Sequence, residues 1–205
     1  YTVKDTLSLH DALPISRTAL FRWLVAALLF SAPIRGAQAA EAARALIEAG
    51  LGTPEAMAGA SWEDRVAVLN AHGYARYDEK TATMLGEAAA LLLREYDGDL
   101  NRLREAAGGD PGAIRRRLEA VKGIGPAGSA IFCREAQAAW PELRPFADDR
   151  ALETARELGL AEDAQGLARL VPEDDFPRLA AALVRTALAG DADEILGQAA
   201  QQEDG

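Results

Sequence analysis

VKGIGPAGSA, residues 121–130, sets two glycines on either side of one isoleucine, with a proline directly after the second glycine. Apolar residues at helical spacing precede this stretch, and a helix is predicted to follow over residues 126–139. The pattern is therefore helix–hairpin–helix. It is compatible with a plain turn between two helices and with a backbone cradle for a phosphate group.

The chemistry of the turn favours an oxygen-rich anion as its ligand. Gly123 and Gly125 permit backbone angles that a side chain would block, and without a Cβ they let a phosphate come close to the amide N–H groups. The second helix begins at Pro126, so its free N–H groups and the positive end of its dipole point the same way. Ile124 is expected to fill the apolar groove between the two helices, and Gly128 to let them approach each other. Contacts of this kind hold a nucleic-acid backbone without reading its sequence.

The rest of the chain predicts an all-α fold. The 205 residues are 49% hydrophobic and only 6% aromatic, and no segment alternates as a strand does. Helix starts are marked by Thr53-Pro54, by the capping-box-like SWED at 61–64 and by Asp110-Pro111. We expect one helical domain over residues 17–189, with nine or ten helices, and an acidic polar tail over residues 190–205.

The first residues read as foreign to the protein. TLSLHDALPI, residues 6–15, resembles the translation of a common sequencing adapter, so residues 1–16 are set aside as non-native. The remaining chain has 21 basic and 30 acidic side chains. Residues 17–147 carry 16 of each sign, whereas residues 148–205 carry five basic and 14 acidic side chains. This charge argues against broad non-specific nucleic-acid binding but leaves a local basic face at Arg115–Arg117 and Lys122.

Residues 22–42, RWLVAALLFSAPIRGAQAAEA, imitate a secretory signal. A basic flank, a hydrophobic run over residues 23–32 and an A-x-A site at 37–39 follow one another. The run is too short to span a membrane. The rival interpretation is a buried helix ended by Pro33.

Cysteine and histidine are too scarce for several kinds of site. Cys133 is the single cysteine, which excludes a disulfide framework and a cysteine-rich metal site, and a reducing cytoplasm is expected. Cys133 is expected to be plain packing and His72 to be structural. No metal site is expected.

Residues 118–130, LEAVKGIGPAGSA, resemble the hairpin of the endonuclease III-like DNA glycosylases, the HhH-GPD superfamily. RPFADDRALETARELGL (144–160) is similar to the segment around that family's catalytic aspartate, and LLFSAPIRGAQAAEAARAL (28–46) is similar to one of its helix pairs. Shorter matches occur in order at TPEAM (53–57), YDEKTATML (77–85) and LVPEDDFPRLAAALV (170–184). The resemblance covers residues 19–188. It implies a two-lobed helical fold in which DNA lies across a groove and the damaged base is flipped out.

The resemblance also assigns roles at two catalytic positions. It places the family's catalytic aspartate at Asp148, where a carboxylate would stabilise positive charge on the sugar and guide water to it. The alternative is a helix cap, and both roles are compatible. Asp149 is expected to be a cap or a surface charge. Ala127 stands where bifunctional members carry a lysine nucleophile, so the resemblance implies a monofunctional glycosylase without lyase activity.

Other positions depart from the family or extend the site. Pro33 replaces the glutamine that fills the gap left by the flipped base. No iron–sulfur cluster is expected, and the resemblance allows a monovalent cation at the hairpin. Tyr74, Tyr77 and Lys80 lie where the family places a wedge loop, and these aromatics either stack on bases or pack the turn. The residues expected to contact DNA are Lys122, Gly123, Ile124, Gly125, Ala127, Gly128 and Arg117.

Three hypotheses follow from these observations. The first is a cytoplasmic, monomeric base-excision glycosylase that acts on double-stranded DNA through Asp148. The second is a catalytically inactive protein that uses the hairpin only to bind the DNA backbone. The third is a secreted helical protein with a signal peptide over residues 17–39.

Overall fold

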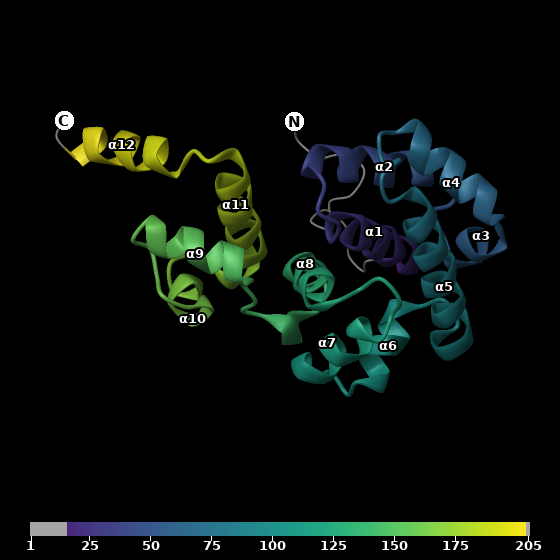
Figure 1. Ribbon diagram of the computed structural model, residues 1–205. Coiled ribbons are helices and arrows are strands. Elements are labelled where there is room, and N and C mark those ends of the chain that lie inside the picture. The colour runs from purple at the N-terminus through teal and green to yellow at the C-terminus, as the bar shows by residue number, and fades with distance from the viewer. Residues whose placement is uncertain (1–15, 204–205) are drawn as a thin grey trace. The chain divides into compact units, whose positions relative to one another are not determined.

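The computed structural model describes residues 16–203, in which helices joined by turns and loops are the regular secondary structure and no strand occurs (Figure 1). The residues set aside as adapter-derived lie outside this range, apart from Ser16. The chain divides into two compact units, one ending at Phe132 and the other beginning at Cys133. The predicted fold class is therefore confirmed, and the single predicted domain consists of two helical units.

The described residues contain twelve α-helices and two short 3₁₀ helices, which is more than the nine or ten helices expected. In the first unit the helices are α1 Arg17–Phe30, α2 Gly36–Glu48, α3 Pro54–Gly59, α4 Trp62–Ala71, α5 Asp78–Tyr96, α6 Leu100–Ala106 and α7 Pro111–Glu119. Helix α8, Pro126–Ala136, crosses the boundary between the units. The second unit contains η1 Pro141–Leu143, α9 Asp149–Glu157, α10 Ala164–Ala168, η2 Glu173–Asp175, α11 Phe176–Ala189 and α12 Ala192–Glu203. Sequence reasoning missed α6 and α10 because helices this short show little periodicity.

Helix α1 forms the centre of the first unit. Nine of its 14 residues are buried, and it contacts α2, α5 and α6 (Figure 1). The Trp23 Nε1–H group donates a hydrogen bond to the Phe132 carbonyl oxygen at 3.2 Å, which ties α1 to α8. The hydrophobic run near the start of the chain is thus the buried helix of the rival interpretation. The A-x-A site lies inside α2, with Ala39 fully buried.

Local capping explains where many of the helices begin. Thr53, Asp110 and Asp148 each accept a hydrogen bond from a backbone N–H in the first turn of their helix. Ser61 and Asp64 form the reciprocal capping box predicted for α4. These bonds join residues three apart, so they depend little on the rest of the fold.

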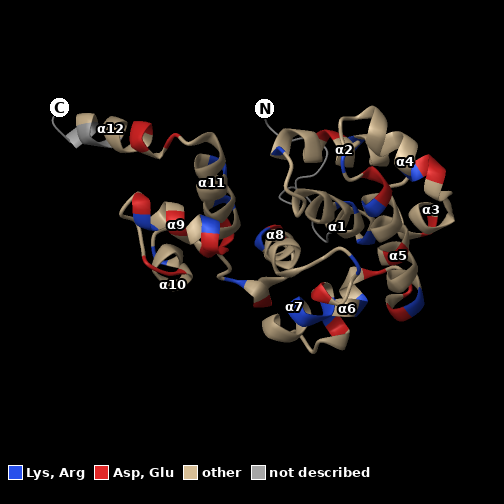
Figure 2. Cartoon of the chain, viewed as in Figure 1, with Lys and Arg blue, Asp and Glu red and all other residues tan. Residues whose placement is uncertain are grey.

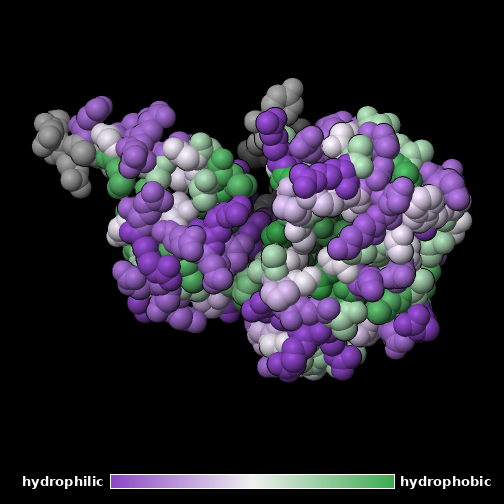
Figure 3. Space-filling view, in the orientation of Figure 1, coloured by the Kyte–Doolittle hydropathy of each residue, from purple (hydrophilic) through white to green (hydrophobic). Residues whose placement is uncertain are grey.

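The second unit has its own small core, in which α9 packs against α11. Its fully or nearly buried residues are Ala151, Ala155, Leu167, Phe176, Ala180, Leu183 and Val184. Hydrophilic side chains cover much of the visible surface of both units, with smaller apolar areas among them (Figure 3). None of the described helices has the length and apolar character needed to cross a membrane.

Candidate nucleic-acid interface

The hairpin between α7 and α8 is anchored by two apolar side chains. Val121 and Ile124 are 1% and 2% exposed. The Ile124 N–H group donates to the Val121 carbonyl oxygen at 3.0 Å, which closes the turn between them. Burial of Ile124 was predicted, and it fixes which side of the turn faces the unit and which faces solvent.

Gly123 belongs to the inward side of the turn. Its φ is +86°, a left-handed conformation that favours glycine. A Cβ at this position would lie 2.9 Å from Leu28 Cδ1 and 3.1 Å from Met84 Cβ, so α1 and α5 leave it no room. Gly123 therefore lets the hairpin pack closely on two other helices of its unit.

Gly125 has a different role from the one predicted for it. Its φ lies outside the left-handed region, so the expectation of a side-chain-excluding backbone angle is wrong at this position. A Cβ at Gly125 would meet nothing within 4 Å. Gly125, Pro126 and Ala127 are all exposed, and they form an open surface at the start of α8. The N–H groups of a first helical turn have no intrahelical partner, so this surface suits an anion.

Gly128 is buried, and the segments that come close to it are not the ones that were expected. A Cβ there would lie 2.7 Å from Ser31 Oγ and 3.4 Å from Ile124 Cγ2. The close neighbours are therefore the C-terminal cap of α1 and the hairpin itself, rather than α7. The prediction that Gly128 brings the two hairpin helices together is corrected accordingly.

A buried hydroxyl joins the two hairpin helices. The Ser129 side chain, fully buried in α8, donates to Glu119 Oε1 at 2.8 Å, with the Pro126 carbonyl oxygen 3.0 Å from the same hydroxyl. Glu119 ends α7 and lies 3.6 Å from the Arg115 guanidinium. Sequence reasoning missed Glu119, and its only signal was its place at the end of the helix before the turn.

The cations expected to bind DNA have partners of their own. Lys122 Nζ lies 3.9 Å from Glu87 Oε2, and both side chains are largely exposed. Arg117 Nη1 donates to the Tyr96 hydroxyl at 3.4 Å. Arg116 lies 3.7 Å from Asp110, and basic and acidic residues are interleaved around α7 (Figure 2). The basic face near the hairpin is therefore partly neutralised by acidic neighbours.

Asp148, in the second unit, uses both of its carboxylate oxygens. Oδ1 accepts from the Ala151 N–H at 3.0 Å, so Asp148 is the N-cap of α9. Oδ2 forms an ion pair with Arg134 Nη1, and the Arg134 and Asp148 side chains are only 10% and 12% exposed. Asp149 and Arg150 next to them are exposed. The structure thus adds to the predicted cap a largely buried charge partner.

The chain just before Asp148 is held by the fully buried amide of Gln137. Gln137 Nε2 donates to the Phe146 carbonyl oxygen at 2.8 Å, and Oε1 accepts from the Phe146 N–H at 3.0 Å. Arg144 Nε donates to the Gln137 carbonyl oxygen at 2.8 Å. Sequence reasoning missed both Gln137 and Arg134. The signal was the group of polar residues Arg134, Glu135 and Gln137, which directly follows the apolar stretch at the end of α8.

Tyr74, Tyr77 and Lys80 do not form one exposed wedge. Tyr74 is 1% exposed, and its hydroxyl donates to the Leu29 carbonyl oxygen at 3.0 Å. Burial raises the pKa of Tyr74 to about 12. Tyr74 therefore packs the turn and cannot stack on a base, which corrects one of its two predicted roles. Tyr77 is half-buried before α5, and Lys80 is exposed in the first turn of that helix.

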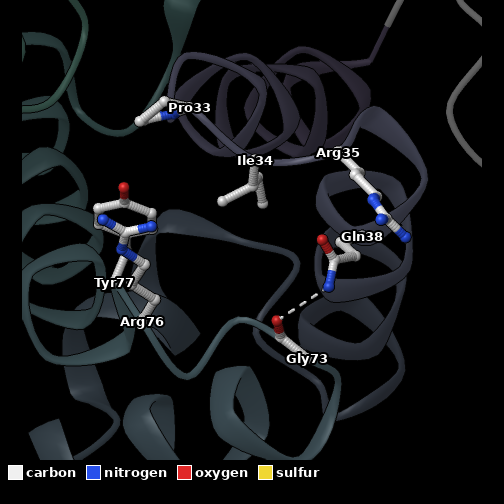
Figure 4. A pocket seen from close by; sticks show the side chains of 7 residues that line it. All are labelled: Pro33, Ile34, Arg35, Gln38, Gly73, Arg76 and Tyr77. Carbon is white, nitrogen blue, oxygen red and sulfur yellow. Dashed lines mark hydrogen bonds between the residues drawn. The ribbon is translucent and has the colours of Figure 1, made fainter.

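An open pocket of about 510 Å³ lies beside Tyr77. It is lined by Pro33, Ile34, Arg35, Gln38, Gly73, Arg76 and Tyr77 (Figure 4). Gln38 Nε2 donates to the Gly73 carbonyl oxygen at 3.4 Å, which joins α2 to the turn before α5. Pro33, where the resemblance expected a glutamine, supplies one wall, while the pocket's amide comes from Gln38.

The remaining singled-out residues have simple environments. Ala127 is exposed and has no amine. Cys133 is buried, and His72 caps α4 with Nδ1 2.9 Å from the Val68 carbonyl oxygen. Among the described residues, no group of three or more His, Cys, Asp and Glu side chains is arranged to hold a metal ion.

Comparison with known proteins gives one structural likeness. The chain is similar to the solved structure of a trapped endonuclease III–DNA covalent intermediate, an estranged-adenine complex, with a TM-score of 0.55 and 17% sequence identity. The similarity covers 87% of this chain and 78% of that one. No protein-family model matches the chain, and no curated protein matches it. The chain therefore has an endonuclease III-like, all-helical fold.

Proposed function

We propose that this protein binds double-stranded DNA through its hairpin and acts as a monofunctional base-excision glycosylase. The observation that carries the proposal is the open surface of Gly125, Pro126 and Ala127 at the start of α8, an 11-residue helix. The inward packing of Gly123 and Ile124 holds that surface in place. The similar solved structure is itself a DNA complex, which supports DNA as the partner.

Asp148 is the residue that would carry the chemistry. Cleavage breaks the bond between the sugar C1′ atom and the base nitrogen, and the base leaves with the bonding electron pair. Positive charge then develops on the sugar, where a nearby carboxylate stabilises it and directs water to C1′. A C1′–O bond forms, and the proton that the water loses goes to the departing base. Asp148 is fixed for such a task by its cap to Ala151 and by Arg134. Ala127 supplies no amine for a Schiff base, so strand cleavage is not expected.

The ion pair favours a second candidate function, DNA binding without catalysis. A carboxylate already paired with an arginine has less charge to offer a developing cation. In this alternative Asp148 and Arg134 serve the second unit only as a structural pair. Both candidates require the hairpin to bind DNA, and they differ in whether a base is released.

Base release distinguishes the two candidates. The protein is incubated with duplexes that contain uracil, oxidised or alkylated bases, and alkali then cuts the strand at any abasic site. Release by the wild type that is lost in Asp148→Asn and kept in Asp149→Asn supports catalysis by Asp148. Tight binding without release across the panel supports the binder. Release that survives in Asp148→Asn contradicts the assignment of this residue.

Binding through the hairpin has its own test and matched control. Gly125→Asp adds a negative charge to the open surface, and it is expected to weaken duplex binding measured by fluorescence anisotropy. Gly59→Asp adds the same charge at another exposed glycine of the first unit where a Cβ would also meet nothing within 4 Å. Equal affinities for the two variants would remove the hairpin from the interface.

A further inference from the structure

The pocket beside Tyr77 carries positive charge without a matching negative charge. Arg35 and Arg76 are exposed, and neither forms an ion pair within residues 16–203. Among the residues that the structure describes, no acidic side chain lines the pocket. This differs from α7, where Arg115 and Arg116 each have an acidic neighbour. Free arginines at a concave surface attract anions, and the guanidinium group matches phosphate oxygens in geometry.

The pocket also offers flat and apolar surface between its charges. The Arg76 guanidinium carbon lies 5.5 Å from the centre of the Tyr77 ring, a cation–π contact. Figure 4 shows this pair on one side of the pocket and Arg35 on the other, with Ile34 between them. The arrangement suits a ligand that has phosphate groups near the arginines and a flat or apolar part near Tyr77 and Ile34.

The backbone at the edge of the pocket also carries partial positive charge, like the two arginines. Arg35 is the N-cap residue of α2 and makes no side-chain capping hydrogen bond. The first N–H groups of this 13-residue helix therefore add partial positive charge next to the Arg35 side chain. This effect reinforces the charge of the two arginines and does not replace it.

We propose that this pocket is a second phosphate-binding site, in which Arg35 and Arg76 hold the backbone of a DNA strand at a place separate from the hairpin. The inference rests on the proposed function and adds to it a contact that the hairpin does not provide. A free nucleotide shares the same chemistry, so the experiment has to distinguish a DNA strand from a mononucleotide.

The test removes the two charges and compares the result with the same change elsewhere. The variant is Arg35→Gln with Arg76→Gln. The control is Arg44→Gln with Arg94→Gln, which takes one arginine from α2 and one from α5, where they pair with Glu41 and Glu95. Affinity for a short labelled duplex is measured by anisotropy as salt is varied. Binding of deoxyadenosine monophosphate is measured by calorimetry.

If Arg35 and Arg76 hold phosphate groups, the pocket variant should bind the duplex more weakly and with a smaller salt dependence. Each phosphate contact contributes about 0.9 to the slope of log affinity against log salt, so losing two lowers the slope by roughly 1.8. The duplex affinity is expected to fall on the order of 10- to 100-fold near 0.1 M salt. The control variant is expected to bind as the wild type does. Circular dichroism melting of both variants checks that the fold is kept.

Other outcomes would overturn the inference in distinguishable ways. Pocket and control variants that bind the duplex equally well, while the wild type binds, would contradict the second site and leave the proposed function intact. Mononucleotide binding that is lost in the pocket variant, with unchanged duplex affinity, would assign the pocket to a free nucleotide instead of a strand. No binding of either ligand by the wild type would contradict the proposed function and the inference together.

Discussion

At the scale of single residues, the most informative pair is Arg134 and Asp148. Asp148 caps α9 with one oxygen and pairs with Arg134 through the other, and both side chains are nearly out of solvent. Removing one partner of such a pair leaves the other charge buried and uncompensated, whereas removing both avoids that cost. This pair therefore links the candidate catalytic group to the stability of its unit.

We expect Arg134→Met to lower the free energy of unfolding by about 3 kcal/mol, because it leaves the Asp148 carboxylate without its cation. The double variant Arg134→Met with Asp148→Asn should lose clearly less than the two single variants added together. Urea denaturation of all three measures this. Arg156→Met, which breaks the more exposed pair with Glu162, is the control and should cost under about 1 kcal/mol. Strictly additive losses would contradict the coupling.

Tyr74 gives a prediction about alkaline stability. Its pKa is raised from 10.0 to about 12 by burial, so the folded state holds the phenol proton more tightly than the unfolded state does. This contribution is complete below pH 10 and is lost as the pH rises toward 12. As the pH rises between these values, the free energy of unfolding of Tyr74→Phe should therefore fall less than that of the wild type. At neutral pH the same substitution should lower the free energy of unfolding by about 1 kcal/mol, because the hydrogen bond to the Leu29 carbonyl oxygen is lost. Urea denaturation across this range measures both effects, and parallel curves would contradict the pKa shift.

At the scale of elements, the hairpin separates two roles that its glycines share in the sequence. Gly123 has a left-handed φ and touches Leu28 and Met84, whereas Gly125 faces open space. One glycine is thus needed for packing, and the other leaves room for a ligand. A substitution at Gly123 should therefore disturb packing and leave the open surface in place, whereas one at Gly125 should change the open surface and leave the packing intact.

We expect Gly123→Ala to lower the free energy of unfolding by about 2 kcal/mol or more, because the new Cβ meets α1 and α5 and the backbone is strained. Gly125→Ala should change it by less than about 0.5 kcal/mol, since nothing lies near the new methyl group. Thermal or urea denaturation of both variants checks the difference. Equal losses would show that the turn is not anchored as the structure has it.

At the scale of the whole molecule, the net charge of −10 limits how the proposed DNA binding can occur. Residues 148–205 hold 14 acidic and five basic side chains, so a polyanion is repelled by much of that region. In the proposed binding, attraction comes from local groups around the hairpin and the pocket, namely Lys122, Arg117, Arg35 and Arg76. The proposed DNA binding would therefore depend on few phosphate contacts.

Salt dependence tests that limit. If four cations contact phosphates, the slope of log affinity against log salt should be no steeper than about −4, because each contact contributes roughly −0.9. Anisotropy titrations with an undamaged duplex at several salt concentrations measure the slope. A much steeper slope would require many more phosphate contacts than these groups provide.

The sequence by itself determined the all-helical fold, many of the helix starts and the hairpin. Caps such as Thr53 and Asp110 act on N–H groups three residues away, and the hairpin turn is set by Gly123 and Ile124 within a few residues. Such local interactions depend only on neighbouring residues, so they can be predicted from the sequence without the packing of distant segments.

Only the tertiary structure decided what surrounds each candidate residue. Arg134 meets Asp148 across 14 positions, Tyr74 reaches the Leu29 carbonyl across 45, and the pocket joins α2 to the turn before α5. The reason is physical: burial and long-range contacts depend on how whole helices pack, and a side chain's type does not reveal which helix it will face. For this reason Tyr74 became a core residue, Asp148 gained a buried partner, and Arg35 and Arg76 lie beside a pocket without an ion pair to any described residue.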